Sequence, residues 1–218
     1  MKRLLLPLLL ILIAIAACGD KAAKDEAPGP FAMSAEEYER WEIALVEMRI
    51  EKNEAFAQPE QTPLLKSDLP TFEGLNYYFP KDDMRFMTPL VTAADGEQVS
   101  LTKRQGQEVP YVRKGHVAFT YEGRVHKLDI FGPAEGEDYL WLPFFDATSG
   151  QETYAGGRYI DVEMTPDGLV DLDFNYAYNP LCDYNPDKFN CTLPPLTNRL
   201  DFAVEAGEKI FGAGDEDH

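Results

Sequence analysis

The sequence predicts a mainly β (α+β) fold in which an N-terminal amphipathic helix packs on an antiparallel β-sandwich or small barrel. Two patterns lead to this prediction. Apolar residues recur at helical spacing between residues 34 and 58, and from about residue 86 onward the period changes to two. The expected strands arrive about every 8–12 residues with no helical pattern between them, which favours an antiparallel sheet.

The helix is expected to begin after Ser34 and to end before Pro59. Ser34 followed by Glu37 is the capping-box pattern, in which each side chain satisfies a backbone N–H group of the other residue. A stripe of apolar residues along one face then indicates packing against a core. The stripe consists of Tyr38, Trp41, Leu45, Met48 and Phe56.

Glycine-bearing turns separate the expected strands. Glu122-Gly123 lies between two alternating runs and predicts a hairpin, and Thr165 to Gly168 predicts the turn before the last strand. The expected strands cover residues 85–93, 97–103, 115–121, 124–131, 138–147, 158–164 and 169–175.

The first twenty residues have the pattern of an export signal. A basic start precedes an apolar run from Leu4 to Ala17, which is too short to span a membrane. Small residues stand directly before Cys18, so the segment resembles the lipobox of bacterial lipoproteins, whose cysteine is acylated and becomes the new N-terminus. An uncleaved membrane anchor is the alternative. The resemblance implies an exported lipoprotein anchored to a membrane of the bacterial envelope, and Gly19 favours the outer membrane in a cell that has one.

These features divide the chain into four parts. Residues 1–17 are the predicted signal peptide, and residues 18–33 are the acylated cysteine with a flexible tether of charged, small and Pro/Gly residues. Residues 34–212 are expected to form a single globular β-rich domain, and residues 213–218 an acidic tail.

Charge excludes one class of partner. The chain has 20 Lys and Arg against 38 Asp and Glu, a formal net charge of −18. Such a surface repels nucleic-acid phosphates, so a DNA- or RNA-binding role is not expected. The predicted partners are the membrane, through the lipid on Cys18, and an envelope ligand or protein whose identity the sequence leaves open. No cofactor is predicted.

The remaining cysteines predict a disulfide. With Cys18 assigned to lipid, Cys182 and Cys191 are left, and export would place them in an oxidising compartment. A metal site and two free thiols are the alternatives. The chain has three histidines, none at ligand spacing from these cysteines, which counts against the metal.

Several motifs resemble one known family. "LPFFDATSGQETYAGGRYIDVE", "DLDFNYAYNPLC", "NCTLPPLTNRL" and "VEAGE" are similar to the bacterial and archaeal domain of unknown function 1684, and "RIEKNEAF" and "FEGLNYYFPKDDMRF" are similar to its lipoprotein-type members. The resemblance covers roughly residues 38–211 and implies no activity. Thr192 and Tyr176 depart from the family pattern, which has proline and a basic residue there. A bound anion that used this basic residue would be lost here.

One expected strand carries oxygen ligands on one face. Asp171, Asp173 and Asn175 alternate with apolar residues, and three such side chains could hold a hard cation such as Ca²⁺. The alternative is a polar strand face in which Asp173 and Asn175 hydrogen-bond the following loop. We favour that alternative, so no metal site is predicted.

The loop of residues 146–158 offers a possible catalytic pair. Asp146 and Glu152 could serve as acid and base of a glycan-directed hydrolase, with Asp171 or Asp173 as further candidates. The alternative is a hairpin with glycine turns in which Arg158 pairs with a neighbouring acid. The sequence leans away from an enzyme.

Residues 172–200 hold many Asn, Pro and aromatic residues, which predicts a rigid surface loop. Its aromatic side chains either lie back on the core or line a recognition surface. The function predicted is therefore a ligand- or partner-binding domain that uses loops 146–158 and 175–199. The candidate binding residues are Tyr154, Arg158, Asn175, Tyr178, Asn179, Tyr184 and Asn198.

Overall fold

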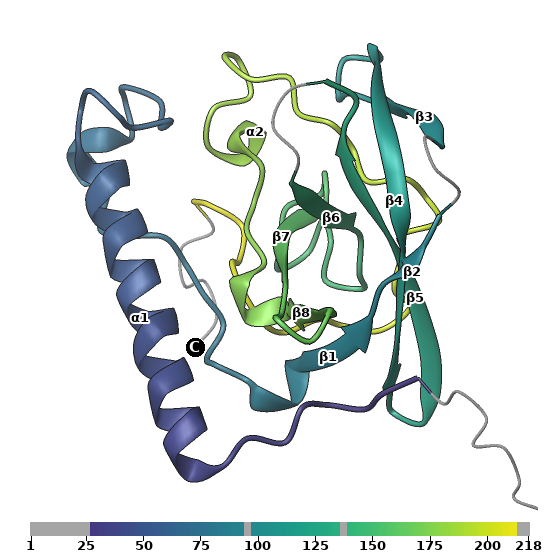
Figure 1. Ribbon diagram of the computed structural model, residues 1–218. Coiled ribbons are helices and arrows are strands. Elements are labelled where there is room, and N and C mark those ends of the chain that lie inside the picture. The colour runs from purple at the N-terminus through teal and green to yellow at the C-terminus, as the bar shows by residue number, and fades with distance from the viewer. Residues whose placement is uncertain (1–26, 94–96, 136–138, 213–218) are drawn as a thin grey trace, which may run out of the picture.

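The computed structural model describes residues 27–93, 97–135 and 139–212 (Figure 1). These residues form an antiparallel sheet that curls into a nearly closed barrel, with one long helix beside it. A barrel is therefore found, not a sandwich. The predicted signal peptide, Cys18 and the acidic tail lie outside the described residues.

One bent stretch of chain closes the barrel. Strands β1 and β2 are separated only by Leu90, and β1 pairs with β8 while β2 pairs with β4. The sheet order is β1-β8-β7-β6-β5-β4-β2, and β3 pairs with residues 108–112 at the start of β4, while β2 pairs with residues 115–116 in its middle. The strands are β1 (Arg85–Pro89), β2 (Val91–Thr92), β3 (Gln98–Thr102), β4 (Glu108–Tyr121), β5 (Arg124–Pro133), β6 (Leu140–Phe144), β7 (Arg158–Met164) and β8 (Leu169–Asp173).

The seam depends on a glycine in β4. β4 has a bulge between Arg113 and Gly115, and Gly115 has a φ of 158°. A Cβ atom at Gly115 would lie 2.3 Å from the carbonyl oxygen of Val91, so only glycine lets β2 approach β4 this closely. Next to it, Thr88 Oγ1 of β1 donates a hydrogen bond of 2.7 Å to Ala118 O of β4.

The predicted β4–β5 hairpin is confirmed. Glu122 and Gly123 both have positive φ, 49° and 73°, as expected of a two-residue turn that matches the twist of the strands. The turn between β7 and β8 is also where the sequence predicts it, and Gly168 N–H donates to Thr165 O at 2.9 Å.

Helix α1 (Ala35–Ala57) begins with the predicted capping box. Glu37 N–H donates to Ser34 Oγ at 3.3 Å, and Ser34 N–H donates to Glu37 Oε2 at 2.8 Å. The buried α1 residues are Trp41, Leu45 and Phe56. The shorter helices are η1 (Leu69–Thr71), η2 (Asp82–Met84), η3 (Phe174–Tyr176) and α2 (Leu181–Tyr184).

None of the helices in the described ranges has the length and apolar character of a membrane span.

The segment before α1 lies on the barrel. Thr120 N–H donates to Pro28 O at 2.7 Å, Thr120 Oγ1 donates to Ala27 O at 2.6 Å, and Phe31 N–H donates to Arg85 O at 2.6 Å. The sequence places residues 27–33 in a flexible tether because they lack an apolar stripe. Their backbone groups nevertheless bond to β4 and β1, so this part is bound to the domain.

Side chains alternate along each strand between the interior of the barrel and its outer face, on which α1 lies. Ile160 and Val162 of β7 are buried in the barrel interior, so Tyr159, Asp161 and Glu163 project from its outer face. The same rule turns Asp171 and Asp173 of β8 outward. The interior is filled by buried apolar residues, among them Phe86, Val117, Phe119, Leu128, Ile130, Leu142, Phe144, Val170, Leu172 and Phe174.

Candidate functional site: a groove on the outer face of the barrel

A groove lies on the outer face of the barrel, bordered by α1 and by the loop that follows β8. It consists of three adjoining cavities of about 1240, 510 and 420 Å³. Asp161 of β7 lines all three cavities, so they form one continuous depression. Volumes of several hundred cubic ångströms are typical of sites that hold a small molecule or several side chains of a partner.

Aromatic rings wall the largest cavity, which we call the aromatic end. Tyr111, Trp141, Tyr159 and Tyr178 form a row in which each ring contacts the next. The Tyr111 and Trp141 rings are stacked at 5.1 Å between centroids, and the two following contacts are edge-to-face at 4.8 and 5.8 Å. Their hydroxyl groups are bonded within the protein, since Tyr159 donates to Thr192 O and Tyr178 donates to Asp161 at 3.1 Å.

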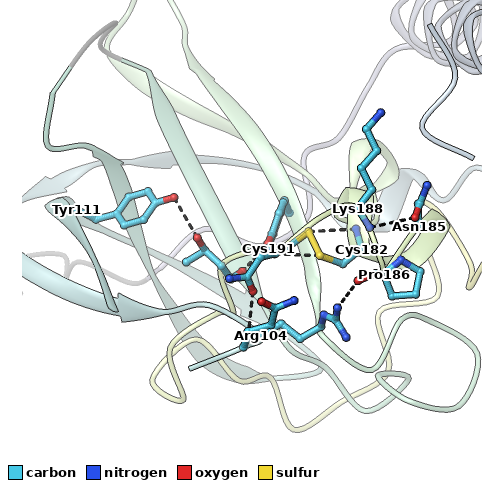
Figure 2. The surroundings of a disulfide bond; sticks show 11 residues. Arg104, Tyr111, Cys182, Asn185, Pro186, Lys188 and Cys191 are labelled. Carbon is cyan, nitrogen blue, oxygen red and sulfur yellow. Dashed lines mark hydrogen bonds between the residues drawn. A yellow bond between two sulfur atoms is a disulfide. The ribbon is translucent and has the colours of Figure 1, made fainter. Parts of the chain in front are cut away.

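The disulfide loop forms another wall of the aromatic end. Cys182 and Cys191 are joined by the predicted disulfide, with Cα atoms 6.0 Å apart (Figure 2). Each cysteine N–H also donates to the sulfur of the other. Figure 2 shows Arg104, from the turn after β3, reaching the carbonyl of Pro186, so the loop is held against the barrel from outside as well. Loop residues that line the groove are Pro180, Leu181, Tyr184, Phe189, Asn190, Cys191 and Thr192.

Several apolar side chains of the groove remain in contact with solvent. Tyr139, Met164 and Leu181 are 47%, 44% and 43% exposed, and all three line the aromatic end. Large apolar side chains that gather at a concave surface are characteristic of binding sites, whereas isolated ones are ordinary on any surface.

Carboxylates dominate the second cavity, which we call the acidic end. Asp161, Glu163, Asp171 and Asp173 line it together with Arg85, Trp41 and Tyr176. Glu163 lies directly across from Asp171 in the β7–β8 ladder, where like charges repel. Arg85 forms a bidentate ion pair with Asp171 at 2.9 and 2.6 Å, which leaves the acidic end with an excess of negative charge.

Two carboxyl groups of the acidic end have raised pKa values. Asp173 is 4% exposed, and burial raises its pKa although Asn175 and Trp41 donate hydrogen bonds to it. The pKa of Asp161 is raised as well, because the walls of the groove reduce the hydration of its carboxylate. Asp161 is nevertheless exposed to solvent in the groove.

A buried carboxylate holds together the third cavity. Glu208 is 2% exposed and pairs with Lys52 of α1, while Tyr77 and Tyr184 donate their hydroxyl groups to it at 3.3 and 2.5 Å. Asn179 N–H donates to the same carboxylate at 2.8 Å. Since these partners come from α1, α2 and the segments between them, Glu208 fixes the helix relative to the disulfide loop.

The candidate cation ligands Asp171, Asp173 and Asn175, which the sequence leaves as the less favoured possibility, do not share one strand face. β8 ends at Asp173, and η3 follows, so Asn175 turns away from Asp171. Asn175 is fully buried, where its amide donates to Lys81 O at 2.7 Å and accepts from Lys81 N–H at 2.8 Å. Asp173 Oδ1 accepts from Asn175 N–H at 2.9 Å. These contacts match the alternative reading in which both side chains anchor the loop. Among the described residues, no three His, Cys, Asp or Glu side chains gather as a metal site requires.

Asp146 and Glu152, the candidate acid and base of the alternative hydrolase hypothesis, do not lie together. Asp146 is 3% exposed and forms a buried ion pair with Arg158 at 3.3 Å, while Glu152 is exposed and accepts from Tyr78 OH at 2.6 Å. Neither carboxylate lines the groove. Arg158 therefore pairs with a neighbouring acid, as the alternative reading of this loop expects.

Three of the predicted surface residues lie in the interior. Arg158, Asn175 and Asn198 are 0% exposed, so their polar groups serve the fold. Asn198 donates to Asp129 O and Pro143 O at 2.8 Å each and accepts from Asp129 N–H at 2.8 Å. The sequence cannot separate an amide that faces solvent from one that bonds buried backbone.

Of the other four candidate binding residues, three line the groove and one does not. Tyr178, Asn179 and Tyr184 line its aromatic end, and Asn179 leaves its buried side-chain oxygen without a partner in the described part of the chain. Tyr154 does not line it. Its ring lies where a side chain at Gly156 would stand, within 2.3 Å of that position.

Tyr159, Asp161 and Glu163 were missed as site residues. The signal was present, because they alternate with Ile160 and Val162 on a strand that the sequence predicts correctly. Which face of that strand carries the site depends on where α1 packs, and periodicity does not give that.

The comparisons with known proteins agree on a family and on a fold. A profile of the family described as "Protein of unknown function (DUF1684)" matches residues 70–209. The solution NMR structure of an uncharacterized protein of Haloarcula marismortui is similar, with a TM-score of 0.64 and 34% identity, over 85% of this chain and 100% of the other. No functionally curated protein matches.

Proposed function

Because the chain belongs to the DUF1684 family, whose description assigns no activity, we propose from the groove itself that the protein is a ligand- or partner-binding domain. We further propose that it is a lipoprotein-type member, exported and held at a membrane of the bacterial envelope by lipid on Cys18.

Exposed apolar side chains in a concave surface carry the binding proposal. Tyr139, Met164 and Leu181 come from three separate segments and converge on the aromatic end. Burying a side chain of this size is worth roughly 1.5–3 kcal/mol relative to leaving it exposed. A bound ligand would recover part of that free energy.

The aromatic end of the groove and the chain that follows the proposed lipid anchor lie toward opposite ends of strand β4. The chain before α1 bonds to Thr120 at one end of β4, whereas Val109 and Tyr111 line the groove at the other end. Nine residue steps separate Tyr111 from Thr120 in this strand, roughly 30 Å at the usual rise. Figure 1 shows α2 and β3 at the end of the barrel opposite the start of the described chain. A lipid at residue 18 would therefore leave the aromatic end facing away from the membrane.

Fluorine NMR provides a direct test of the groove, because the chain has two tryptophans. Trp141 lines the aromatic end and Trp41 lines the acidic end. The full chain, labelled with 5-fluorotryptophan in detergent, is titrated with peptides, muropeptides and oligosaccharides. We expect at least one class to shift the Trp141 signal, and Leu181→Ser with Tyr139→Ser to remove the shift. Leu196→Ser, at a side chain that is 78% exposed outside the groove, is the control.

Binding that leaves both tryptophan signals unchanged, or that survives the double substitution, would contradict the groove as the site.

The anchor has a separate test. Cys18→Ala should leave the protein unprocessed or release it from the membrane fraction in a detergent-partition assay. A native protein without lipid on its first residue would contradict the proposal.

A further inference from the structure

We propose that the groove binds an extended polypeptide segment of a partner protein, in which a Lys or Arg residue accompanies apolar or prolyl residues. This inference rests on the proposed binding function of the groove. The apolar residues would occupy the aromatic end, and the basic side chain would enter the acidic end.

The arrangement of the rings disfavours a sugar as the ligand. A sugar ring packs its C–H face flat against an open aromatic face. Here the face of Trp141 is covered by Tyr111, and the following contacts turn ring edges into neighbouring rings. Trp141 and Tyr159 are only 5% and 9% exposed. The side chains that stay exposed at this end are Tyr139, Met164 and Leu181, and the flexible apolar Met164 and Leu181 suit contact with aliphatic or prolyl side chains.

The edge of β7 offers backbone groups to a peptide. β7 pairs with β8 only at Glu163 and Met164, and with the loop at Tyr159. Asp161 lies between these pairings, and among the described residues no strand partner faces it on that side. An unpaired strand edge at the floor of a groove can bond the backbone of an extended segment, which a small cation or a lipid chain could not do.

The negative charge of the acidic end favours a basic residue in the bound segment. Arg85 is ion-paired with Asp171 and Lys52 with Glu208. The charge of Lys52 also acts on Asp161, but neither cation forms an ion pair with Asp161 or Glu163 in the described part of the chain. Glu163 has no ion-pair partner among the described residues, and the hydroxyl group of Tyr178 is the donor to Asp161. A cation at this position would gain both carboxylates.

Aromatic rings at the acidic end add to its fit for a cation. Trp41 and Tyr176 line the same cavity as Asp161 and Glu163, and a guanidinium group near such rings is also attracted by their π-electrons. The net charge of −18 would favour encounter with basic segments over long range at low salt.

The test compares three fluorescent decapeptides. One combines Leu, Pro and two Arg, the second replaces Arg with Glu, and the third keeps Arg but replaces Leu and Pro with Ser. The full chain in detergent is titrated with each, followed by peptide anisotropy and by the two fluorotryptophan signals. We expect only the first peptide to bind tightly, to shift both signals, and to lose affinity as salt is raised.

Matched variants separate local charge from overall charge. Asp161→Asn with Glu163→Gln should weaken binding of the first peptide about tenfold or more at low salt, a change of about 1.4 kcal/mol. Glu54→Gln with Glu60→Gln removes the same charge from exposed positions outside the groove and should leave affinity within about twofold. Equal melting temperatures would establish that both double variants fold.

Contrary outcomes are distinct. If the Glu peptide binds as well as the Arg peptide, or the two double variants bind equally, the basic occupant is wrong. If no peptide binds but chitohexaose shifts the Trp141 signal, the groove remains a binding site and the polypeptide is wrong. If no probe shifts either signal, the inference and the proposed function both fail.

Discussion

Replacing Asp146 with alanine should lower the free energy of unfolding by about 3–5 kcal/mol, as expected when one partner of a buried ion pair is removed. The Asp146 and Arg158 side chains are 1% and 0% exposed. The other groups that accept from Arg158 are the carbonyl oxygens of Val204, Ala206 and Glu208, at 2.7, 2.5 and 3.2 Å. Neutral carbonyls do not cancel the positive charge, so the guanidinium would stay buried without a counter-ion.

Lost hydrogen bonds add to this cost. Val204 N–H and Thr148 Oγ1 donate to Asp146 at 2.7 and 2.8 Å, and leaving a buried donor unpaired costs about 1–3 kcal/mol. The cost of these hydrogen bonds is already part of the loss measured when a buried ion pair is broken, so the expected decrease in the free energy of unfolding stays at about 3–5 kcal/mol. Against a total stability of about 5–15 kcal/mol for a typical domain, this loss is a large fraction of the free energy of unfolding.

Urea unfolding of the full chain in detergent at pH 7, followed by tryptophan fluorescence, measures the loss. Glu152→Gln is the control, because Glu152 is exposed and its main contact is the hydroxyl of Tyr78. We expect it to cost at most about 1 kcal/mol. The double substitution Asp146→Leu with Arg158→Met should recover much of the stability, since it leaves no buried charge. A single variant as stable as the control, or a double variant no better than Asp146→Ala, would refute the reasoning.

The other predictions concern pH, the disulfide and one buried amide. Burial raises the pKa of Asp183 to about 7, so its folded form holds a proton that the unfolded form loses near pH 4. Stability should therefore fall as pH rises from about 4 to 7, by up to ~1.4 kcal/mol per pH unit, and Asp183→Asn should flatten that fall in urea unfolding at several pH values. An unchanged slope would contradict this. Cys182→Ser should cost ~2–3 kcal/mol, measured by thermal melting with and without reductant. Equal melting of the wild type in both conditions would count against the bridge as a stabiliser. Asn198→Ala removes three buried hydrogen bonds and should cost roughly 2–4 kcal/mol in urea unfolding, while groove binding by the folded fraction stays the same. If the variant binds more weakly but is equally stable, Asn198 contributes to binding and the structural role is wrong.

Local patterns allowed much of the fold to be predicted from the sequence. The capping box at Ser34 acts over a few residues, and the Glu122-Gly123 turn fixes the hairpin by its own backbone preference. Both are therefore visible in a short window of sequence. Closure of the barrel is different, because it depends on β2 crossing Gly115 of β4, two segments that are distant in the chain.

The site was predicted less well because polarity alone does not separate a ligand contact from a buried structural group. Arg158 was a candidate binding residue and Asp146 a candidate catalytic residue. Both side chains are buried, and each forms an ion pair with the other. Tyr178, Asn179 and Tyr184, which the sequence offers as candidates for a binding surface, line the groove, although Asn179 and Tyr184 are each only 2% exposed. Their position follows from the disulfide loop, whose bridge could be inferred from the cysteine count.

The groove exists because α1 does not cover the outer face of β7 completely. Trp41 bonds to Asp173 at one end, and Lys52 pairs with Glu208 farther along the helix. Both contacts are polar, and they reach from α1 to β8 and to the C-terminal segment that follows the barrel strands. Apolar packing along the whole helix would have closed the space over Asp161. The two polar contacts hold α1 in place together with the buried Leu45 between them, and Asp161 stays open to solvent, so the groove is kept by the same interactions that position the helix.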